Sequence, residues 1–184
     1  MSFSPAGKKQ LAAYAALFVV NIIVLGLSAR VNEFQEFFFI ADLFPLGLSI
    51  TTLVILSLLL ILDARLPNSF AGRPQFRIPL FAVMTIFWLA FNAFSSSRWR
   101  FIPLPCSGIP SDFADQRSWC HNVQALQGFV WIEWLILLAI TVATLQYTLA
   151  QSQQGNKHIF STSLSRYRPA AGRNQHLNGF THYA

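Results

Sequence analysis

Residues 43–62 of this chain read LFPLGLSITTLVILSLLLIL. A helix of about 20 uncharged residues is about 30 Å long, which matches the hydrocarbon core of a bilayer. This stretch belongs to the second of four apolar segments, none of which contains lysine or arginine. The expected spans cover about residues 11–28, 40–62, 78–94 and 125–149. We therefore expect an all-α integral membrane protein, folded as an antiparallel four-helix bundle.

The composition also favours a membrane protein, because 54% of the residues are hydrophobic and only 11% are charged. We expect an N-terminal segment over residues 1–10, one membrane domain over 11–149 and a polar tail over 150–184. This division leaves no room for a separate catalytic domain. The chain also has no phosphate-binding glycine loop, nucleophile elbow or HExxH motif, so we expect neither an enzyme nor a cofactor.

The basic residues predict the orientation, because loops on the cytoplasmic side carry an excess of lysine and arginine. Nine lie on the side of the two termini: Lys8, Lys9, Arg65, Arg73, Arg77, Lys157, Arg166, Arg168 and Arg173. The other four lie on the opposite side: Arg30, Arg98, Arg100 and Arg117. We expect both termini to be cytoplasmic, in a membrane of the secretory pathway or in the plasma membrane. A competing interpretation makes the first segment a cleaved signal peptide, which would leave every later loop on the same side.

The net charge of +6 does not indicate a nucleic-acid partner, because the basic residues are spread over several membrane-flanking stretches. Membrane lipids are the expected partners. Arg65, Arg73 and Arg77 lie in the turn region between the second and third spans. At that depth they are expected to contact lipid headgroups.

Three polar residues interrupt the apolar segments at comparable depth. Asn21 and Asn92 lie in the outer halves of the first and third spans, and Glu133 is the one acid deep in a span. An acid at that depth should be protonated or should face a polar partner, and the two asparagines are candidates. The three residues thus predict an intramembrane polar seam that clasps the helices. The alternative is that Glu133 takes part in proton or solute passage, as intramembrane acids do in carriers.

The longer outer loop contains the two cysteines of the chain, Cys106 and Cys120. On the exoplasmic side, where the compartment is oxidising, they predict a disulfide. A metal site is disfavoured because the spacing is not that of a CxxC knuckle and His121 is the single histidine nearby.

After Leu149 the composition turns polar, which predicts a disordered cytoplasmic tail. Serines and threonines at 161–165 precede Arg166 and Arg168. Phosphorylation there would weaken attraction to an anionic leaflet, although a passive solvated tail is the simpler interpretation.

These features together resemble the MARVEL family, particularly its fungal members. The resemblance rests on four spans with cytoplasmic termini, the cysteine pair in the second outer loop, and the Gly128-Phe129-Val130-Trp131 stretch. It covers roughly residues 8–147. The cysteine pair followed by Phe129 and Trp131 is its most particular part. Claudins carry their cysteine pair in the first outer loop, and tetraspanins have a CCG motif, which this chain lacks.

The resemblance implies a protein without catalytic activity that organises membrane domains or assists vesicle traffic and membrane apposition. Its partners would be membrane lipids, a second copy of the chain or other membrane proteins. The alternative function is a small carrier or channel subunit that uses Glu133 with Asn21 and Asn92.

Overall fold

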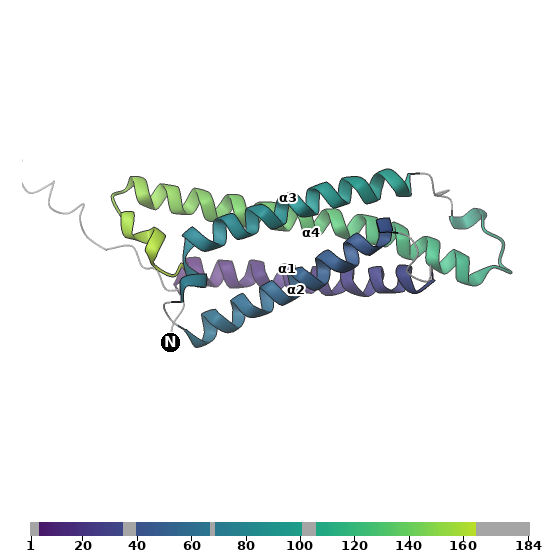
Figure 1. The fold of residues 1–184 in the computed structure, drawn as a ribbon, viewed down its shortest axis with the longest axis horizontal. Helices are drawn as coiled ribbons and strands as arrows, with labels where there is room; N and C mark the ends of the chain where they lie inside the picture. Colours follow the sequence, from purple (N-terminus) through teal and green to yellow (C-terminus); the bar gives the residue numbers. More distant parts are fainter. Residues whose placement is uncertain (1–3, 35–39, 67–68, 101–105, 165–184) are drawn as a thin grey trace, which may run out of the picture.

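Four long helices form an elongated bundle in the computed structural model of the protein (Figure 1). The structure describes residues 4–34, 40–66, 69–100 and 106–164. The helices are α1 (Pro5–Phe34), α2 (Ile40–Arg65), α3 (Pro74–Trp99) and α4 (Ala114–Gln153). Three short 3₁₀ helices connect or follow them: η1 (Phe70–Gly72), η2 (Cys106–Gly108) and η3 (Lys157–Ser161).

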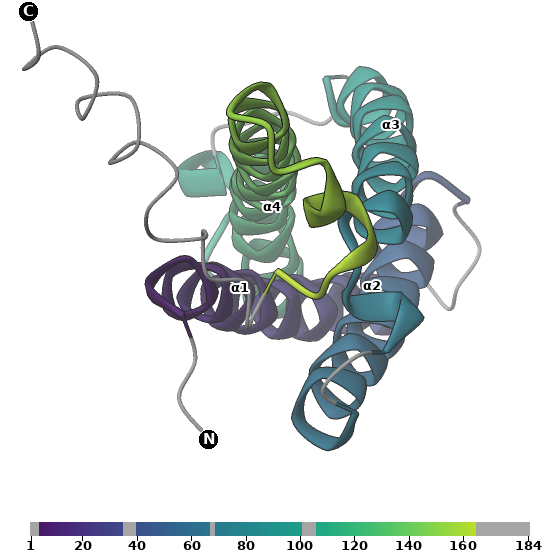
Figure 2. The ribbon, with the colours of Figure 1, turned by 90° about the vertical axis from the view of Figure 1, so that its left-hand side faces the viewer.

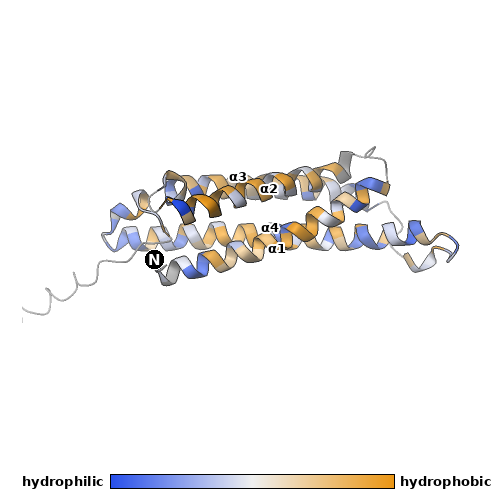
Figure 3. Ribbon diagram, turned by 90° about the horizontal axis from the view of Figure 1, so that it is seen from below, coloured by the Kyte–Doolittle hydropathy of each residue, from blue (hydrophilic) through white to orange (hydrophobic). Residues whose placement is uncertain are grey.

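Each of the four helices is long and apolar enough to cross a membrane, as the sequence predicted. The most apolar window of each has a mean hydropathy between 1.8 and 2.4. Figure 3 shows the apolar residues along the middle of the bundle and the polar ones toward its ends. The helix α4 begins at Ala114, well before the predicted span, because its polar first turns continue the same helix. The apolar composition therefore predicted the four apolar helices, but it did not predict the residue at which α4 begins.

The helices pack around a shared core in which α1 contacts both α2 and α4, and α3 contacts α4 (Figure 2). Leu17, Leu56, Trp88 and Leu126 are fully buried there. Large apolar side chains also cover the outer faces of all four helices, including Val19, Val54, Ile86 and Leu135. Lipid offers no hydrophobic drive for helices to associate, so apolar residues are expected on both faces of such helices.

At the end of the bundle away from the N-terminus, the helix η2 is linked to α4. The Sγ atoms of Cys106 and Cys120 lie 2.00 Å apart, at disulfide bonding distance. The two residues are separated by 14 positions in the sequence, and both are buried. The link ties the described part of the outer loop to the first turns of α4.

The expectation of a disordered tail is wrong for residues 150–164. The helix α4 continues to Gln153, and Gly155, which follows its C-cap, has a φ of 86°, the left-handed conformation that favours glycine. The amide of Asn156 donates to the carbonyl of Gln151, and that of Gly155 to the carbonyl of Ser152. This is the hydrogen-bond pattern of a Schellman motif. Residues 165–184, the rest of the predicted tail, lie outside the described residues.

After this turn, residues 157–164 fold back across the end of the bundle (Figure 2). We call this segment the inner cap. Ile159 and Leu164 are buried in it and pack with Tyr147. The backbone amide of Leu164 donates to the carbonyl of Gly72, 3.3 Å away. The hydroxyl of Ser4 donates to the carbonyl of Leu164 at 3.4 Å. The cap therefore connects α4 to the α2–α3 turn and to the start of α1, and this pairing is not visible in its polar composition.

The close approach of the cap requires glycine at position 72. A Cβ on Gly72 would lie 2.6 Å from Oγ of Ser163 and 3.3 Å from Oδ1 of Asp63. Both distances are shorter than an ordinary van der Waals contact, so any side chain there would push the cap outward.

We predict that Gly72→Ala loosens the inner cap without unfolding the bundle. Because opening of the cap then costs less free energy, the amides of residues 159–164 should exchange with deuterium at least about 10-fold faster. Hydrogen exchange of the full chain in detergent micelles measures this. Gly26→Ala is the matched control, since a Cβ there meets nothing within 4 Å. Equal exchange of the cap in the two variants would contradict the account.

Candidate functional site

The polar side chains inside the bundle are the candidate site. Asn21, Asn92 and Glu133 are 0%, 1% and 0% exposed, respectively. They therefore face other helices rather than lipid, which is the lower-cost arrangement for polar groups at this depth.

The two asparagines join different pairs of helices. The Nδ2 atom of Asn21 in α1 donates to the carbonyl oxygen of Ser49 in α2, at 2.9 Å. The Nδ2 atom of Asn92 in α3 donates to the carbonyl oxygen of Val130 in α4, also at 2.9 Å. A helical carbonyl has a second lone pair, so it can accept this bond in addition to its helical one. Each asparagine thus acts as a clasp between two neighbouring helices.

Glu133 does not take the partners that the sequence suggested. The amide donors of Asn21 and Asn92 bind backbone carbonyls, and neither carboxyl oxygen of Glu133 has a hydrogen-bond partner among the described residues. The sequence places three polar residues at similar depth, but depth does not determine which side of each helix they occupy. The expected seam is therefore two separate clasps and one isolated buried carboxyl group.

Further hydrogen bonds between helices involve residues that were not predicted from the sequence. The indole nitrogen of Trp88 in α3 donates to the hydroxyl of Thr52 in α2 at 3.1 Å. The hydroxyls of Thr85 and Thr141 lie 3.4 Å apart and join α3 to α4. Trp88 is fully buried in the core. A buried indole N–H needs an acceptor, so a tryptophan in mid-span was the available signal.

An ion pair lies at the end of the bundle that holds the N-terminus and the inner cap. The guanidinium of Arg77 in α3 donates to the carboxylate of Asp63 in α2. The same guanidinium donates to the carbonyl of Ala71 at 2.9 Å and to the hydroxyl of Tyr14 in α1 at 3.4 Å. It also lies over the ring of Tyr14, 5.5 Å from its centroid. We call Tyr14, Asp63 and Arg77 the inner clamp, because they connect α1, α2 and α3.

The expectation that Arg77 contacts lipid headgroups is wrong. Its side chain is fully buried between the helices, where a headgroup cannot reach it. Arg65 is exposed, and Arg73 is half-buried with its guanidinium 5.9 Å from the ring centroid of Phe70. For these two residues, contact with headgroups stays a prediction.

The chain positions of Asp63 and Arg77 contained a signal for their pairing. The two residues lie at equal distances along the chain on either side of Phe70, in the turn between two antiparallel helices. Residues placed symmetrically about such a turn come to the same level of the hairpin. An acid and a base at these positions are therefore candidates for an ion pair.

The described part of the chain contains no group of three or more His, Cys, Asp or Glu residues that could hold a metal ion. The chemistry of this interior is thus that of hydrogen bonds, one buried ion pair and one isolated carboxyl group.

Comparison with known proteins does not supply a family. No protein-family model, no curated protein and no solved structure matches the chain. The function of the chain is therefore inferred from the geometry of the bundle.

We predict that Asp63→Asn destabilises the protein by about 3 kcal/mol, because it leaves the buried guanidinium of Arg77 without a counter-charge. Thermal unfolding in detergent micelles measures the loss. Asp112→Asn is the matched control at an exposed acid in the outer loop, and it should change stability by less than about 0.5 kcal/mol.

The double variant Asp63→Leu/Arg77→Leu should recover part of the stability lost in Asp63→Asn, since it removes both buried charges. Equal stability of Asp63→Asn and Asp112→Asn would show that the ion pair does not hold the helices together.

Proposed function

We propose that this chain is a multi-pass membrane protein without catalytic activity, which organises membrane domains or assists vesicle traffic and membrane apposition. It acts through contacts with lipids and with other membrane helices. Both of its termini face the cytoplasm. The MARVEL-like arrangement of four spans and a cysteine pair in the second outer loop supports this proposal.

One observation gives this proposal most of its support: several buried polar donors bind acceptors on neighbouring helices and so hold the helices to one another. Asn21, Trp88 and Asn92 each donate to an acceptor on a different helix. The inner clamp joins α1, α2 and α3 at one end of the bundle. Groups committed in this way stabilise a rigid body, which suits a protein that presents surfaces to its surroundings.

The surface that the bundle presents is apolar and partly aromatic. The ring of Phe44 stacks on Phe91 with centroids 4.4 Å apart, and it meets Phe94 edge-on at 5.5 Å. Phe87 and Phe94 remain about half exposed. Such a face provides large rings for contact with acyl chains or with a helix of another protein.

The distribution of charge supports the orientation of the proposal. Lys8, Lys9 and Arg65 are exposed at the end that holds the inner cap. Basic residues on this side are expected to face the cytoplasm and its anionic leaflet.

The isolated carboxyl group of Glu133 favours a second candidate function. A buried acid whose oxygens have no hydrogen-bond partner among the described residues is costly, and such residues often mark proton or ion pathways. Under this alternative the chain is a small carrier or channel subunit, and Glu133 binds the transported proton or cation.

Two measurements on the full chain separate the candidates. A tagged copy imaged in cells should gather in membrane patches or vesicles, and Glu133→Gln should leave that pattern unchanged. In vesicles reconstituted with the protein, the rate of proton uptake should not exceed that of empty vesicles. Glu33→Gln, at an exposed acid, is the matched control for the substitution.

A uniform distribution of the tagged protein over the membrane would contradict the organising role. The carrier would be established instead if the wild-type protein and Glu33→Gln take up protons and a folded Glu133→Gln variant does not.

A further inference from the structure

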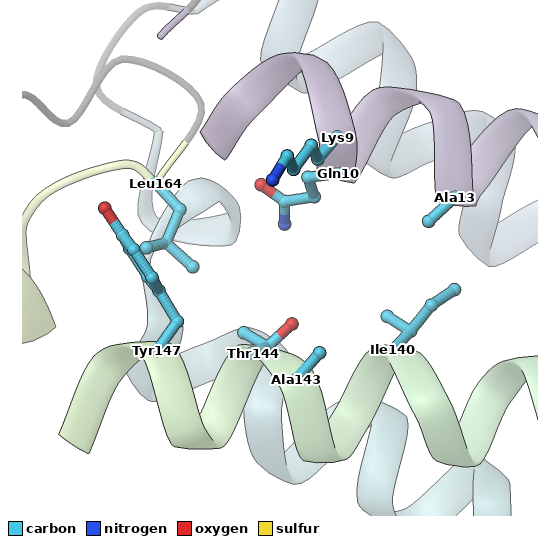
Figure 4. Close-up of a pocket in the computed structure, with 8 residues that line it drawn as sticks. All are labelled: Lys9, Gln10, Ala13, Ile140, Ala143, Thr144, Tyr147 and Leu164. Atoms are coloured by element: carbon cyan, nitrogen blue, oxygen red, sulfur yellow. The ribbon is translucent and has the colours of Figure 1, made fainter. Parts of the chain in front are cut away.

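A pocket of about 260 Å³ opens between α1 and α4 at the end of the bundle that holds the inner cap (Figure 4). Two segments far apart in the chain form its walls, and Leu164 of the inner cap contributes the end wall. Its lining residues are Lys9, Gln10, Ala13, Ile140, Ala143, Thr144, Tyr147 and Leu164.

The lining is almost entirely apolar, and its few polar groups lie toward one end along the helix axes. Lys9, Gln10 and Tyr147 lie toward the end of the bundle, and Ala13 and Ile140 lie deeper (Figure 4). From Tyr147 to Ile140 the helix rises about 10 Å, which is less than the roughly 15 Å thickness of one hydrocarbon leaflet. The pocket thus has an apolar interior, with Lys9 at one end, and room for the first part of one acyl chain.

The charge of the pocket indicates the headgroup. Lys9 contributes a cation at the mouth, and none of the lining residues is acidic. A second pocket, on the other face of α1, is lined by Gly7, Leu11 and Leu60 among others and includes Asp63. An anionic headgroup is therefore favoured in the first pocket.

The walls of the first pocket are held in place by the contacts described above. The amide of Gln10 donates to the hydroxyl of Tyr14 at 2.8 Å, and Tyr14 belongs to the inner clamp. Leu164 is 4% exposed and is fixed through its backbone to Gly72 and Ser4. These contacts connect two of the pocket's lining residues, Gln10 and Leu164, to the rest of the fold.

We propose that this pocket binds one anionic phospholipid from the leaflet nearest the termini. The headgroup pairs with Lys9 and accepts hydrogen bonds near Gln10 and Thr144, and one acyl chain lies against Ala13, Ile140 and Ala143. The inference rests on the membrane embedding in the proposed function, but it does not require the organising role.

Titration with phosphatidylserine against phosphatidylcholine of the same acyl chains tests the site. The full-length protein in micelles is titrated with each lipid, and native mass spectrometry counts the lipid retained. The wild type should retain one phosphatidylserine in preference to phosphatidylcholine. Lys9→Gln should weaken this binding about five-fold. Ala143→Phe should weaken it at least as much, because the new ring fills the chain region.

Each variant has a matched control on the same helix. Lys8→Gln removes a neighbouring charge, and Ala139→Phe adds the same ring outside the lining; both should bind within two-fold of the wild type. Thermal unfolding in phosphatidylcholine micelles shows whether each variant is folded, and Ala143→Leu replaces Ala143→Phe if the latter is not.

Equal losses in Lys8→Gln and Lys9→Gln would show diffuse surface attraction and overturn the proposal. Equal retention of the two lipids by the wild type, or full binding by a folded Ala143 variant, would overturn it as well. The binding measurement is independent of clustering in cells, so failure of the lipid site and failure of the organising role are distinguishable.

Discussion

A polar group inside a bilayer is costly unless it has a partner within the protein, and the hydrogen bonds between the helices of this bundle reflect that constraint. Water is absent from the hydrocarbon core, so an unsatisfied donor there costs several kcal/mol. Asn21, Asn92 and Trp88 meet this requirement by donating to a neighbouring helix. Since apolar side chains gain little by leaving lipid for another helix, these few bonds and close packing specify which helices are neighbours.

The same constraint explains the inner end of the bundle. The guanidinium of Arg77 is buried against Asp63 and Tyr14, and Tyr14 in turn accepts from Gln10 at the wall of the lipid pocket. Leu164 contributes both to the cap and to that pocket. The inner cap, the ion pair and the proposed lipid site are therefore parts of one connected arrangement, and a change in any of them should affect the others.

The sequence predicted the four long apolar helices, because the length of an apolar segment is a local property of the chain. It did not predict the details that depend on helix rotation. Arg77 was expected to contact headgroups because arginines near the ends of spans often do so. Its actual partner, Asp63, lies on another helix, so the pairing depends on how the two helices pack. Glu133 was expected to pair with Asn21 and Asn92. The amide donors of both asparagines bind backbone carbonyls instead, and the carboxyl oxygens of Glu133 have no partner among the described residues. The folded segment 157–164 was not predicted because its composition is polar. Two buried residues, Ile159 and Leu164, pack against the bundle and fix its position.

We expect the four helices to cross the membrane as an antiparallel bundle, with both termini on one side and the cysteine loop on the other. Glycosylation mapping tests it most directly. An Asn-x-Thr acceptor is introduced, one at a time, next to Ser111, between Leu66 and Ser69, or on spacers added to either terminus. The account predicts that the acceptor next to Ser111 is glycosylated in microsomes and that the others are not. Glycosylation of the Leu66–Ser69 turn or of either terminus would contradict it.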